Sequence, residues 1–488
     1  MEDELLDETQ HGGKVALEFV QKKRFSSKIY AAIVVFVIAV ILIAVLITLF
    51  ATGVIGGNKA QTPTNVTNVT INGVPGERWD YVTVRPGAHM FYMFYGSTKT
   101  TPSRDQLPLI LWLQGGPGGS STGFGNFAEI GPLDINLKPR KSTWLSRANL
   151  LFIDNPVGTG WSYVDNSSLY TTDVDQIASD LVVAIKVIFN QIPKMRKVPF
   201  YIFAESYGGK MTVAFAIQLK KAIASNSIQC NFHGVALGDS WISPYDYVNT
   251  WGPYLFALSL LDKKEEKSVQ YYSSSIAQAM KNQQYQNATN LWRSAERYIE
   301  LVTGNVNFYN VLSHRYRFSS KKREQSEQEK LEAYYHSRVR RSSGRTLSSV
   351  MNSDVRKMLG SIIPSNVVWA GQANQVFAYQ EIDFMKPVID RVDELLNMNV
   401  TVAVYNGQLD VICDTLGTEA WMAKLKWKNL QNFQSAKKHI MKLSNKSVAG
   451  FYKKFNNLSL FWILKAGHMV PIDAPDAALQ MVDTILTF

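Results

Sequence analysis

The chain has 488 residues, 46% of them hydrophobic, and a formal net charge of +11. This length fits one large α/β domain with insertions or two ordinary domains, and the hydrophobic content is sufficient for a core. The positive charge gathers near residues 22–28 and 315–345 without interleaved aromatic residues, which argues against nucleic-acid binding. Cys230 and Cys413 are too few for a usual zinc site, and they form one disulfide or remain two thiols. We expect no metal and no cofactor.

The first 75 residues predict a membrane anchor. Residues 29–55 are an uncharged apolar run, longer than the roughly 20 residues that cross a bilayer. A buried core helix is the weaker alternative, because the run has no polar stripe. Basic residues precede the run, so residues 1–28 are predicted to be a cytoplasmic tail. Residues 56–75, rich in Gly, Asn and Thr, are expected to form a flexible stalk.

The rest of the chain, residues 76–488, is then lumenal or extracellular, in the lysosomal, endosomal or secretory pathway. The predicted protein is a single-pass type II membrane protein. Glycosylation acceptors agree with this topology, since all seven Asn-x-Ser/Thr sites follow the apolar run. They are Asn65, Asn68, Asn166, Asn287, Asn399, Asn445 and Asn457.

Short apolar runs alternate with helical patterns along the body of the chain. A hairpin is predicted over residues 81–95, and helices near residues 173–189 and 211–222. Buried strands are predicted at residues 109–113, 150–153, 198–203, 234–238, 400–405 and 458–463. The alternation predicts an α/β fold with a central, mostly parallel sheet.

Residues 247–364 are more polar and helical, and we interpret them as a cap inserted over the sheet. Within this segment, residues 318–344 are charged and are predicted to form a loop. The sequence Arg338-Val339-Arg340-Arg341 resembles a dibasic processing site, but a solvated basic surface is the favoured interpretation.

A candidate nucleophile stands between the predicted strand 198–203 and the helix that follows it. Ser206 lies in Ala204-Glu205-Ser206-Tyr207-Gly208, the pattern of a nucleophile elbow with Ala204 in place of the usual glycine. Small neighbours are needed because strand and helix backbones approach closely there, and the serine adopts a strained conformation. A structural turn without catalysis is the alternative.

A serine nucleophile needs an imidazole base and an acid that orients it, and in α/β-hydrolases these follow in the order Ser, Asp, His. His468 is the preferred base because its loop follows an apolar strand, whereas His439 is expected at the surface and His233 in a structural role. Asp410 is the preferred acid, and Asp414 its rival and a candidate helix N-cap.

An oxyanion hole requires backbone N–H groups that point at a developing alkoxide. The glycine-rich stretch Gln114-Gly115-Gly116-Pro117-Gly118-Gly119 follows a predicted strand and lacks the lysine of a phosphate-binding loop. We expect the N–H groups of Gly116 and Tyr207 to form the pair.

These motifs together resemble the serine carboxypeptidase family from about Trp79 to the end of the chain. The resemblance rests on residues 112–121 (WLQGGPGGSS), residues 154–160 (DNPVGTG), Glu205-Ser206-Tyr207, and the loops of Asp410 and His468. It implies an α/β-hydrolase fold, the triad Ser206, Asp410 and His468, and peptide substrates.

The resemblance also implies that Gln114, Gly115 and Glu205 bind the C-terminal carboxylate of a substrate. A carboxyl group that faces a carboxylate repels it unless one of the two holds a proton. We therefore expect activity that is best in acid and that declines as Glu205 ionises.

This chain departs from the family pattern at two positions of the same loop. Family members commonly have Asn at the position of Gln114 and Cys at the position of Gly119. The anchor also replaces a cleaved signal peptide, and at most one disulfide can form. The leading hypothesis is a membrane-anchored serine carboxypeptidase acting through an acyl-enzyme. An acyltransferase with the same triad and a catalytically weak binding protein are the alternatives.

Overall fold

The computed structural model describes most of the chain after residue 77. The described residues are 78–97, 99, 101–103, 105–314, 330, 333–334, 345–371 and 373–488. The expected tail, membrane segment and stalk therefore lie outside them, as do Asn65, Asn68 and the Arg338–Arg341 motif. Within the described part of the chain, no helix combines the length and apolar character that crossing a membrane demands.

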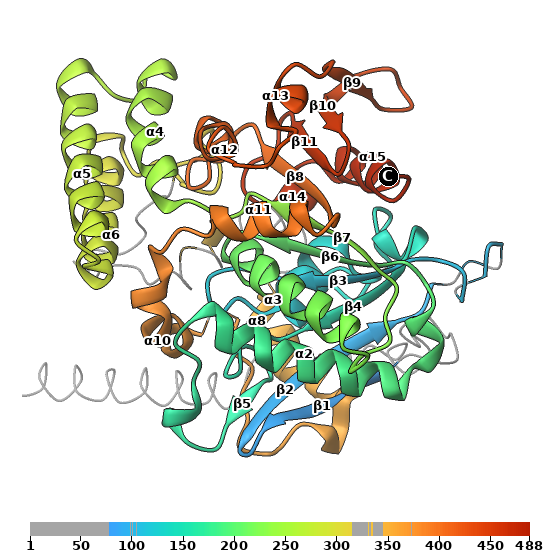
Figure 1. Ribbon diagram of the computed structural model, residues 1–488. Coiled ribbons are helices and arrows are strands. Elements are labelled where there is room, and N and C mark those ends of the chain that lie inside the picture. The colour runs from blue at the N-terminus through green and yellow to red at the C-terminus, as the bar shows by residue number, and fades with distance from the viewer. Residues whose placement is uncertain are drawn as a thin grey trace, which may run out of the picture. The chain divides into compact units, whose positions relative to one another are not determined.

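A single mixed sheet forms the centre of the described structure (Figure 1). Its middle consists of six neighbouring parallel strands, in the order β4, β3, β6, β7, β8 and β11. Their bounds are β3 (Leu109–Leu113), β4 (Asn149–Ile153), β6 (Phe200–Glu205), β7 (Phe232–Gly238), β8 (Thr401–Gly407) and β11 (Leu458–Ile463). Most of these residues are buried, as expected of parallel strands covered on both faces.

Antiparallel strands extend the sheet at both edges. One edge is formed by β1 (Arg78–Arg85) and β2 (Ala88–Tyr95), with the short β5 (Tyr163–Val164) paired to β2. The other edge is formed by β10 (Val448–Phe455) and β9 (His439–Lys442). The predicted hairpin over residues 81–95 is confirmed, whereas the sequence interpretation did not include β5, β9 and β10.

Helices α2 (Val174–Gln191) and α3 (Tyr207–Ala224) pack together across one face of the sheet (Figure 1). The Asp173 side chain caps α2 by accepting hydrogen bonds from the N–H groups of Asp175 and Gln176. Ile177, Leu181 and Ile185 recur every fourth residue and are fully buried. This apolar stripe stabilises the helix against the sheet, at roughly 1.5–3 kcal/mol for each buried side chain.

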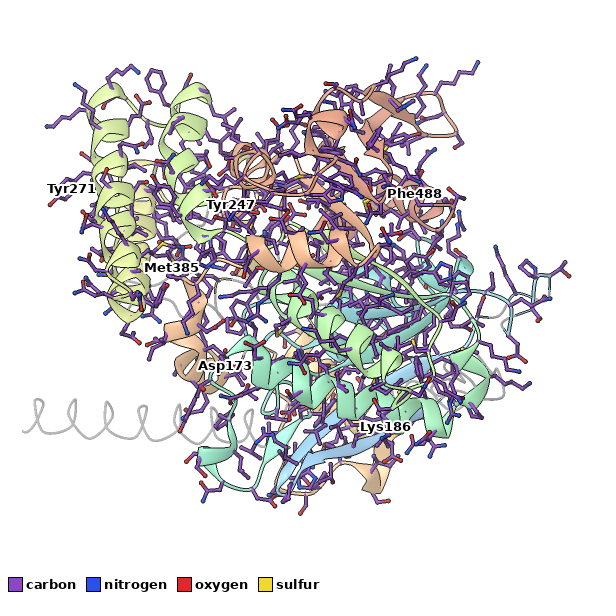
Figure 2. The ribbon with its side chains drawn as sticks, in the orientation of Figure 1. Asp173, Lys186, Tyr247, Tyr271, Met385 and Phe488 are labelled. Carbon is purple, nitrogen blue, oxygen red and sulfur yellow. The ribbon has the colours of Figure 1, made fainter. Side chains whose placement is uncertain are left out.

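The long segment between β7 and β8 is helical. α5 (Lys263–Lys281) and α6 (Tyr285–Val302) pack against each other beside α4 (Pro244–Ala257), and Tyr271 projects from the outer side of α5 (Figure 2). The segment continues through α8 (Leu347–Val350), η6 (Met351–Val355), α9 (Arg356–Leu359), η7 (Gly360–Ile362), α10 (Asn374–Phe384) and α11 (Ile389–Asn397). The helical character predicted for residues 247–364 agrees with these elements.

The remaining helical segments connect strands or close the C-terminal end. They are η2 (Ser121–Ile130), η3 (Trp144–Ser146), η4 (Ser167–Leu169), η5 (Pro193–Arg196), α12 (Thr415–Met422), α13 (Leu430–Gln434), α14 (Val470–Asp473) and α15 (Pro475–Ile485). This architecture is an α/β-hydrolase fold. The carboxyl ends of β3, β6, β8 and β11 lead directly into the loops of Gln114, Ser206, Asp410 and His468.

Candidate active site

Ser206 occupies the sharp turn between β6 and α3. Its backbone has φ 60° and ψ −130°, a conformation that residues other than glycine rarely adopt. The turn is tight: a Cβ atom on Gly208 would lie 2.3 Å from the carbonyl oxygen of Leu113, and one on Gly209 would lie 2.0 Å from Ser240 Oγ. The strained elbow predicted from the sequence is confirmed.

Asp410 and His468 form a buried pair in the loops after β8 and β11. His468 Nδ1 lies 2.8 Å from Asp410 Oδ2, and the two residues are 2% and 0% exposed. Asp410 Oδ1 accepts a second hydrogen bond from the N–H group of Ile412 at 3.0 Å. In the tautomer in which Nδ1–H donates to the Asp410 carboxylate, Nε2 carries no proton and can accept one.

The other candidates for acid and base have different surroundings. Asp414 accepts a hydrogen bond from the Gly417 N–H group at 2.9 Å and caps α12, the N-cap role considered for it from the sequence. His439 lies exposed in β9, as expected, and His233 is exposed at the start of β7.

Ser206 and His468 line one cavity together with Gly115, Gly116, Gln114 and Glu205. Among the hydrogen bonds of the described residues, none joins the Ser206 hydroxyl to the His468 ring. Catalytic hydrogen bonds are often loose before substrate binds, so a shared cavity is the relevant observation.

The predicted oxyanion groups lie beside the nucleophile. A Cβ atom on Gly115 would lie 2.5 Å from Ser206 Cβ, so only glycine allows the loop to approach the elbow this closely. Gly116 has φ 113°, another conformation that favours glycine. Tyr207 opens α3, and the first N–H groups of a helix have no acceptor within it.

A chain of buried polar groups leads from the sheet to the cavity. Trp112 Nε1 donates to Gln114 Oε1 at 2.8 Å, and Gln114 Nε2 donates to Glu205 Oε1 at 2.7 Å. The Glu205 carboxyl group also contacts that of Glu129, and two carboxyl groups can form a hydrogen bond only when one is protonated. Both glutamates are 1% exposed.

Burial and mutual repulsion favour the protonated forms of this pair. Burial, then the neighbouring Glu129, raise the pKa of Glu205 well above its ordinary value. Burial also raises the pKa of Glu129, to about 7. The sequence interpretation missed Glu129, although an isolated acid in the apolar run Phe127-Ala128-Glu129-Ile130 could have indicated a buried carboxyl group.

Aromatic and aliphatic side chains form the remaining cavity wall. Trp241 follows β7, Trp292 comes from α6, Phe377 and Phe384 come from α10, and Tyr309 and Ile412 complete the wall. Cys413 is fully buried and is not among the residues that line this cavity. The wall suits an apolar substrate side chain.

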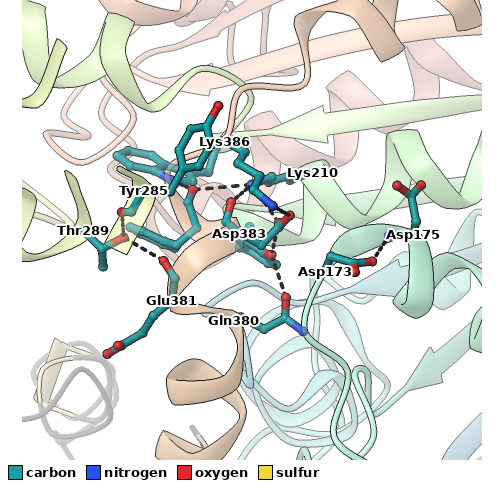
Figure 3. A network of polar contacts seen from close by, with 12 residues as sticks. Asp173, Asp175, Lys210, Tyr285, Thr289, Gln380, Glu381, Asp383 and Lys386 are labelled. Carbon is teal, nitrogen blue, oxygen red and sulfur yellow. Dashed lines mark hydrogen bonds and ion pairs between the residues drawn. The ribbon is translucent and has the colours of Figure 1, made fainter. Parts of the chain in front are cut away.

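A buried ion pair fastens α10 to the helix that follows the nucleophile. Lys210 Nζ lies 2.9 Å from Asp383 Oδ2, with the side chains 0% and 4% exposed (Figure 3). The Tyr207 hydroxyl donates to the same oxygen at 2.7 Å. Burial lowers the pKa of Lys210 to about 8 in spite of the opposing effect of Asp383. The Tyr207 hydroxyl also lies 3.2 Å from Gln380 Oε1.

Both cysteines are free thiols, which excludes the single disulfide left open by the sequence. Asp410, Cys413 and His468 place potential metal-binding atoms within 4.8 Å of one another. However, Asp410 and His468 already bind each other, and burial raises the pKa of the Cys413 thiol well above its ordinary value. A thiolate ligand is therefore disfavoured, and we assign no metal to this group.

The predicted glycosylation acceptors differ in accessibility. Asn166, Asn287, Asn399 and Asn445 are exposed. Asn457 is half-buried, and its amide nitrogen, the atom that would carry a glycan, donates to the carbonyl oxygens of Leu396 at 3.0 Å and Val400 at 2.9 Å. Asn457 is therefore the poorest acceptor of the five.

Comparisons with known proteins identify the family to which the chain belongs. Residues 71–487 match the family described as serine carboxypeptidase, Peptidase_S10. The chain is 50% identical over 415 residues to the retinoid-inducible serine carboxypeptidase of Mus musculus, covering 84% of this chain and 91% of the mouse protein. It is 42% identical over 430 residues to serine carboxypeptidase-like 51 of Arabidopsis thaliana, and this match covers 85% of this chain and 93% of the plant protein.

Among solved structures, the prohormone-processing carboxypeptidase Kex1(delta)p from Saccharomyces cerevisiae superposes with a TM-score of 0.70. Its sequence is 20% identical to this one, and the match covers 85% of this chain and 92% of the yeast chain. The two proteins share their fold.

Proposed function

Since the chain belongs to the serine carboxypeptidase family and is a serine carboxypeptidase, we propose that Ser206, His468 and Asp410 are its catalytic triad. One observation carries this proposal: His468, which is bound to the buried Asp410, lines the same cavity as the strained Ser206 elbow. The negative charge of Asp410 holds the ring tautomer and stabilises the imidazolium that forms during the reaction.

The reaction proceeds in two halves. Ser206 Oγ attacks the carbonyl carbon of the last peptide bond while His468 Nε2 accepts the hydroxyl proton. The N–H groups of Gly116 and Tyr207 stabilise the oxyanion. His468 then returns the proton to the leaving nitrogen, and the C-terminal amino acid departs. Water, deprotonated by His468, attacks the acyl-enzyme, releases the shortened peptide and restores Ser206.

Recognition of the substrate's C-terminal carboxylate falls to Gln114, Gly115 and Glu205, with Glu129 behind them. Glu205 in its acid form can donate a hydrogen bond to that carboxylate, whereas its ionised form repels it. The raised pKa values of Glu205 and Glu129 keep this pair protonated in acid. The enzyme therefore works best at acidic pH.

The aromatic wall determines which residues the enzyme removes. Trp241, Trp292, Phe377 and Phe384 offer no charge partner to a substrate side chain, so we expect preference for large apolar residues next to the scissile bond.

We further propose that residues 29–55 anchor the enzyme as a type II membrane protein with its catalytic domain in an acidic lumen or outside the cell. The apolar run and the exposed Asn166, Asn287, Asn399 and Asn445 support this topology. Glycosidase treatment of the protein made in eukaryotic cells should increase its gel mobility. Alkaline carbonate should leave it in the membrane unless residues 1–55 are deleted.

The decisive assay compares an N-blocked dipeptide that has a free carboxylate with the same dipeptide as its C-terminal amide. Wild-type protein should release the terminal residue from the first far faster than from the second. Ser206→Ala should lower kcat by on the order of 10⁵-fold or more. Transfer of the acyl group to an added amine in preference to water would indicate an acyltransferase. Undiminished hydrolysis by Ser206→Ala would overturn the assignment.

A further inference from the structure

Asp239 is a buried acid that the reaction described above does not use. It follows β7 directly, is 0% exposed, and has φ 40°, which is unusual for a residue with a side chain. Its N–H group donates to the Tyr405 carbonyl oxygen at 2.9 Å, and its Oδ1 accepts from the Gly407 N–H group at 2.8 Å. The first bond holds the Asp239 backbone and the second its side chain against the end of β8, the strand that leads into the loop of Asp410.

The second oxygen of Asp239 has an unusual neighbour. Asp239 Oδ2 is buried and has no hydrogen-bond donor among the described residues, and the Asp410 carboxyl group lies within hydrogen-bonding reach of the Asp239 side chain. Among the described residues, no lysine or arginine forms an ion pair with Asp239. Two ionised carboxylates in contact without a cation would repel each other strongly in this buried site, whereas one shared proton converts the repulsion into a hydrogen bond.

The surroundings indicate which aspartate holds the proton. Asp410 accepts the Ile412 N–H group and binds His468, a group that gains positive charge during the reaction. Asp239 accepts one backbone N–H group and faces other acids: Asp410, Asp473, Glu205, Tyr405 and Cys413. The proton is therefore more stable on Asp239.

We propose that Asp239 is a positioning residue that remains protonated through the catalytic cycle and donates a hydrogen bond to Asp410. This inference rests on the proposed triad. The bond holds the Asp410 carboxylate in place, and Asp410 keeps the single negative charge that orients His468. The Asp239 proton is not transferred to substrate. Burial and the nearby Asp410 charge raise the pKa of Asp239 well above its ordinary value, in agreement with this role.

The chemistry of Asn provides a matched test. In Asp239→Asn, the amide oxygen can still accept from Gly407 and the amide NH₂ can still donate to Asp410, but the side chain cannot ionise. Asp239→Ala removes the donor. With a p-nitrophenyl ester, which has no C-terminal carboxylate, acylation can be measured without the contribution of Glu205 to binding.

We expect Asp239→Asn to retain kcat within about threefold of wild type at acidic pH, while Asp239→Ala loses on the order of 10- to 100-fold in kcat with little change in KM. Ester acylation by Asp239→Asn should decline less at alkaline pH than acylation by wild type. Circular dichroism establishes that each variant is folded. If the alanine variant does not fold, the comparison of the asparagine and wild-type pH profiles decides alone.

The inference is overturned if folded Asp239→Asn loses as much kcat as Asp239→Ala. It is also overturned if Asp239→Ala keeps the kcat of wild type, or if wild type and Asp239→Asn have identical pH profiles at alkaline pH. Retained activity in Ser206→Ala would instead refute the triad. Failure of the proposed role of Asp239 is thereby distinguished from failure of the proposed triad.

Discussion

The carboxyl group of Glu205, one residue before the nucleophile, contacts that of Glu129, in the helical segment η2 after the glycine-rich loop, in the interior of the protein. Gln114 donates a hydrogen bond to Glu205 Oε1, whereas no donor among the described residues bonds to Glu205 Oε2. A pair of this kind is stable when it holds protons and attracts a carboxylate only in that state. Substrate binding and protein stability should therefore both depend on its ionisation.

The first prediction concerns KM. For a peptide with a free C-terminal carboxylate, KM should be constant below about pH 6 and rise roughly tenfold by pH 8, because the pair begins to ionise near the pKa of about 7 of Glu129. Steady-state kinetics across this range measures the effect. A C-terminal amide substrate should show no such rise, and a flat KM for the free acid would contradict the assignment of the pair to carboxylate binding.

Glu129→Gln should weaken the rise of KM between pH 6 and 8, because the variant lacks the group that ionises first. The matched control is Asp414→Asn. Asp414 is also a buried acid whose pKa is raised to about 7 by burial, but its carboxyl group accepts from Thr250 and Gly417, whereas that of Glu129 contacts Glu205. The control should show the wild-type rise, and equal profiles for both variants would mean that Glu129 does not contribute to binding.

Stability should decrease as pH rises from about 5 to 8. The pKa of Glu129 is higher in the folded protein than in the unfolded chain, so its contribution to stability is fully present below its unfolded value and is lost as pH rises through about 7. The change should be on the order of 3 kcal/mol for this group. Thermal unfolding at a series of pH values measures it. The slope should be smaller in Glu129→Gln, and a slope unchanged by this substitution would argue against the raised pKa.

Removing the Lys210 side chain should be strongly destabilising. Lys210→Met removes the buried cation of Asp383 and leaves only the more distant Lys386, whose Nζ lies 3.9 Å from Asp383 Oδ1, so the cost should be about 3–5 kcal/mol in the free energy of unfolding. The aromatic residues of α10 should also lose their fixed position, which raises KM for apolar substrates. The control is Lys221→Met, which removes the exposed pair with Glu394 and should cost less than about 1 kcal/mol. Urea unfolding of both variants provides the comparison, and equal costs would refute the role of the buried pair.

The sequence predicted those parts of the fold that depend on local pattern. The strands at residues 109–113 and 458–463 have the predicted bounds, and the elbow at Ser206 has the predicted strain. Such elements follow from apolar runs and small residues next to a turn. The order of strands in the sheet, in contrast, depends on pairing between distant segments, and the short β5 and β9 carry too few residues for a periodic signal.

The same contrast between local pattern and long-range contact applies to the candidate site. The motifs placed Ser206, Asp410 and His468 in loops after strands. In the structure Ser206 and His468 line one cavity, and the buried Asp410 binds His468. Glu129 and Asp239 gain their importance only from the carboxyl groups that the fold brings against them. Local sequence does not reveal that contact. The aromatic wall likewise comes from helices far apart in the chain, so local sequence could not show which side chains line the cavity.

The most direct test of the account is to map the adduct formed by a serine-directed phosphonate with mass spectrometry while carboxypeptidase activity is followed on the same sample. We predict one adduct per chain, on Ser206, with activity lost in proportion to labelling and with labelling slowed in His468→Ala. An adduct on another residue, or full activity in completely labelled protein, would contradict the claim that Ser206 is the nucleophile.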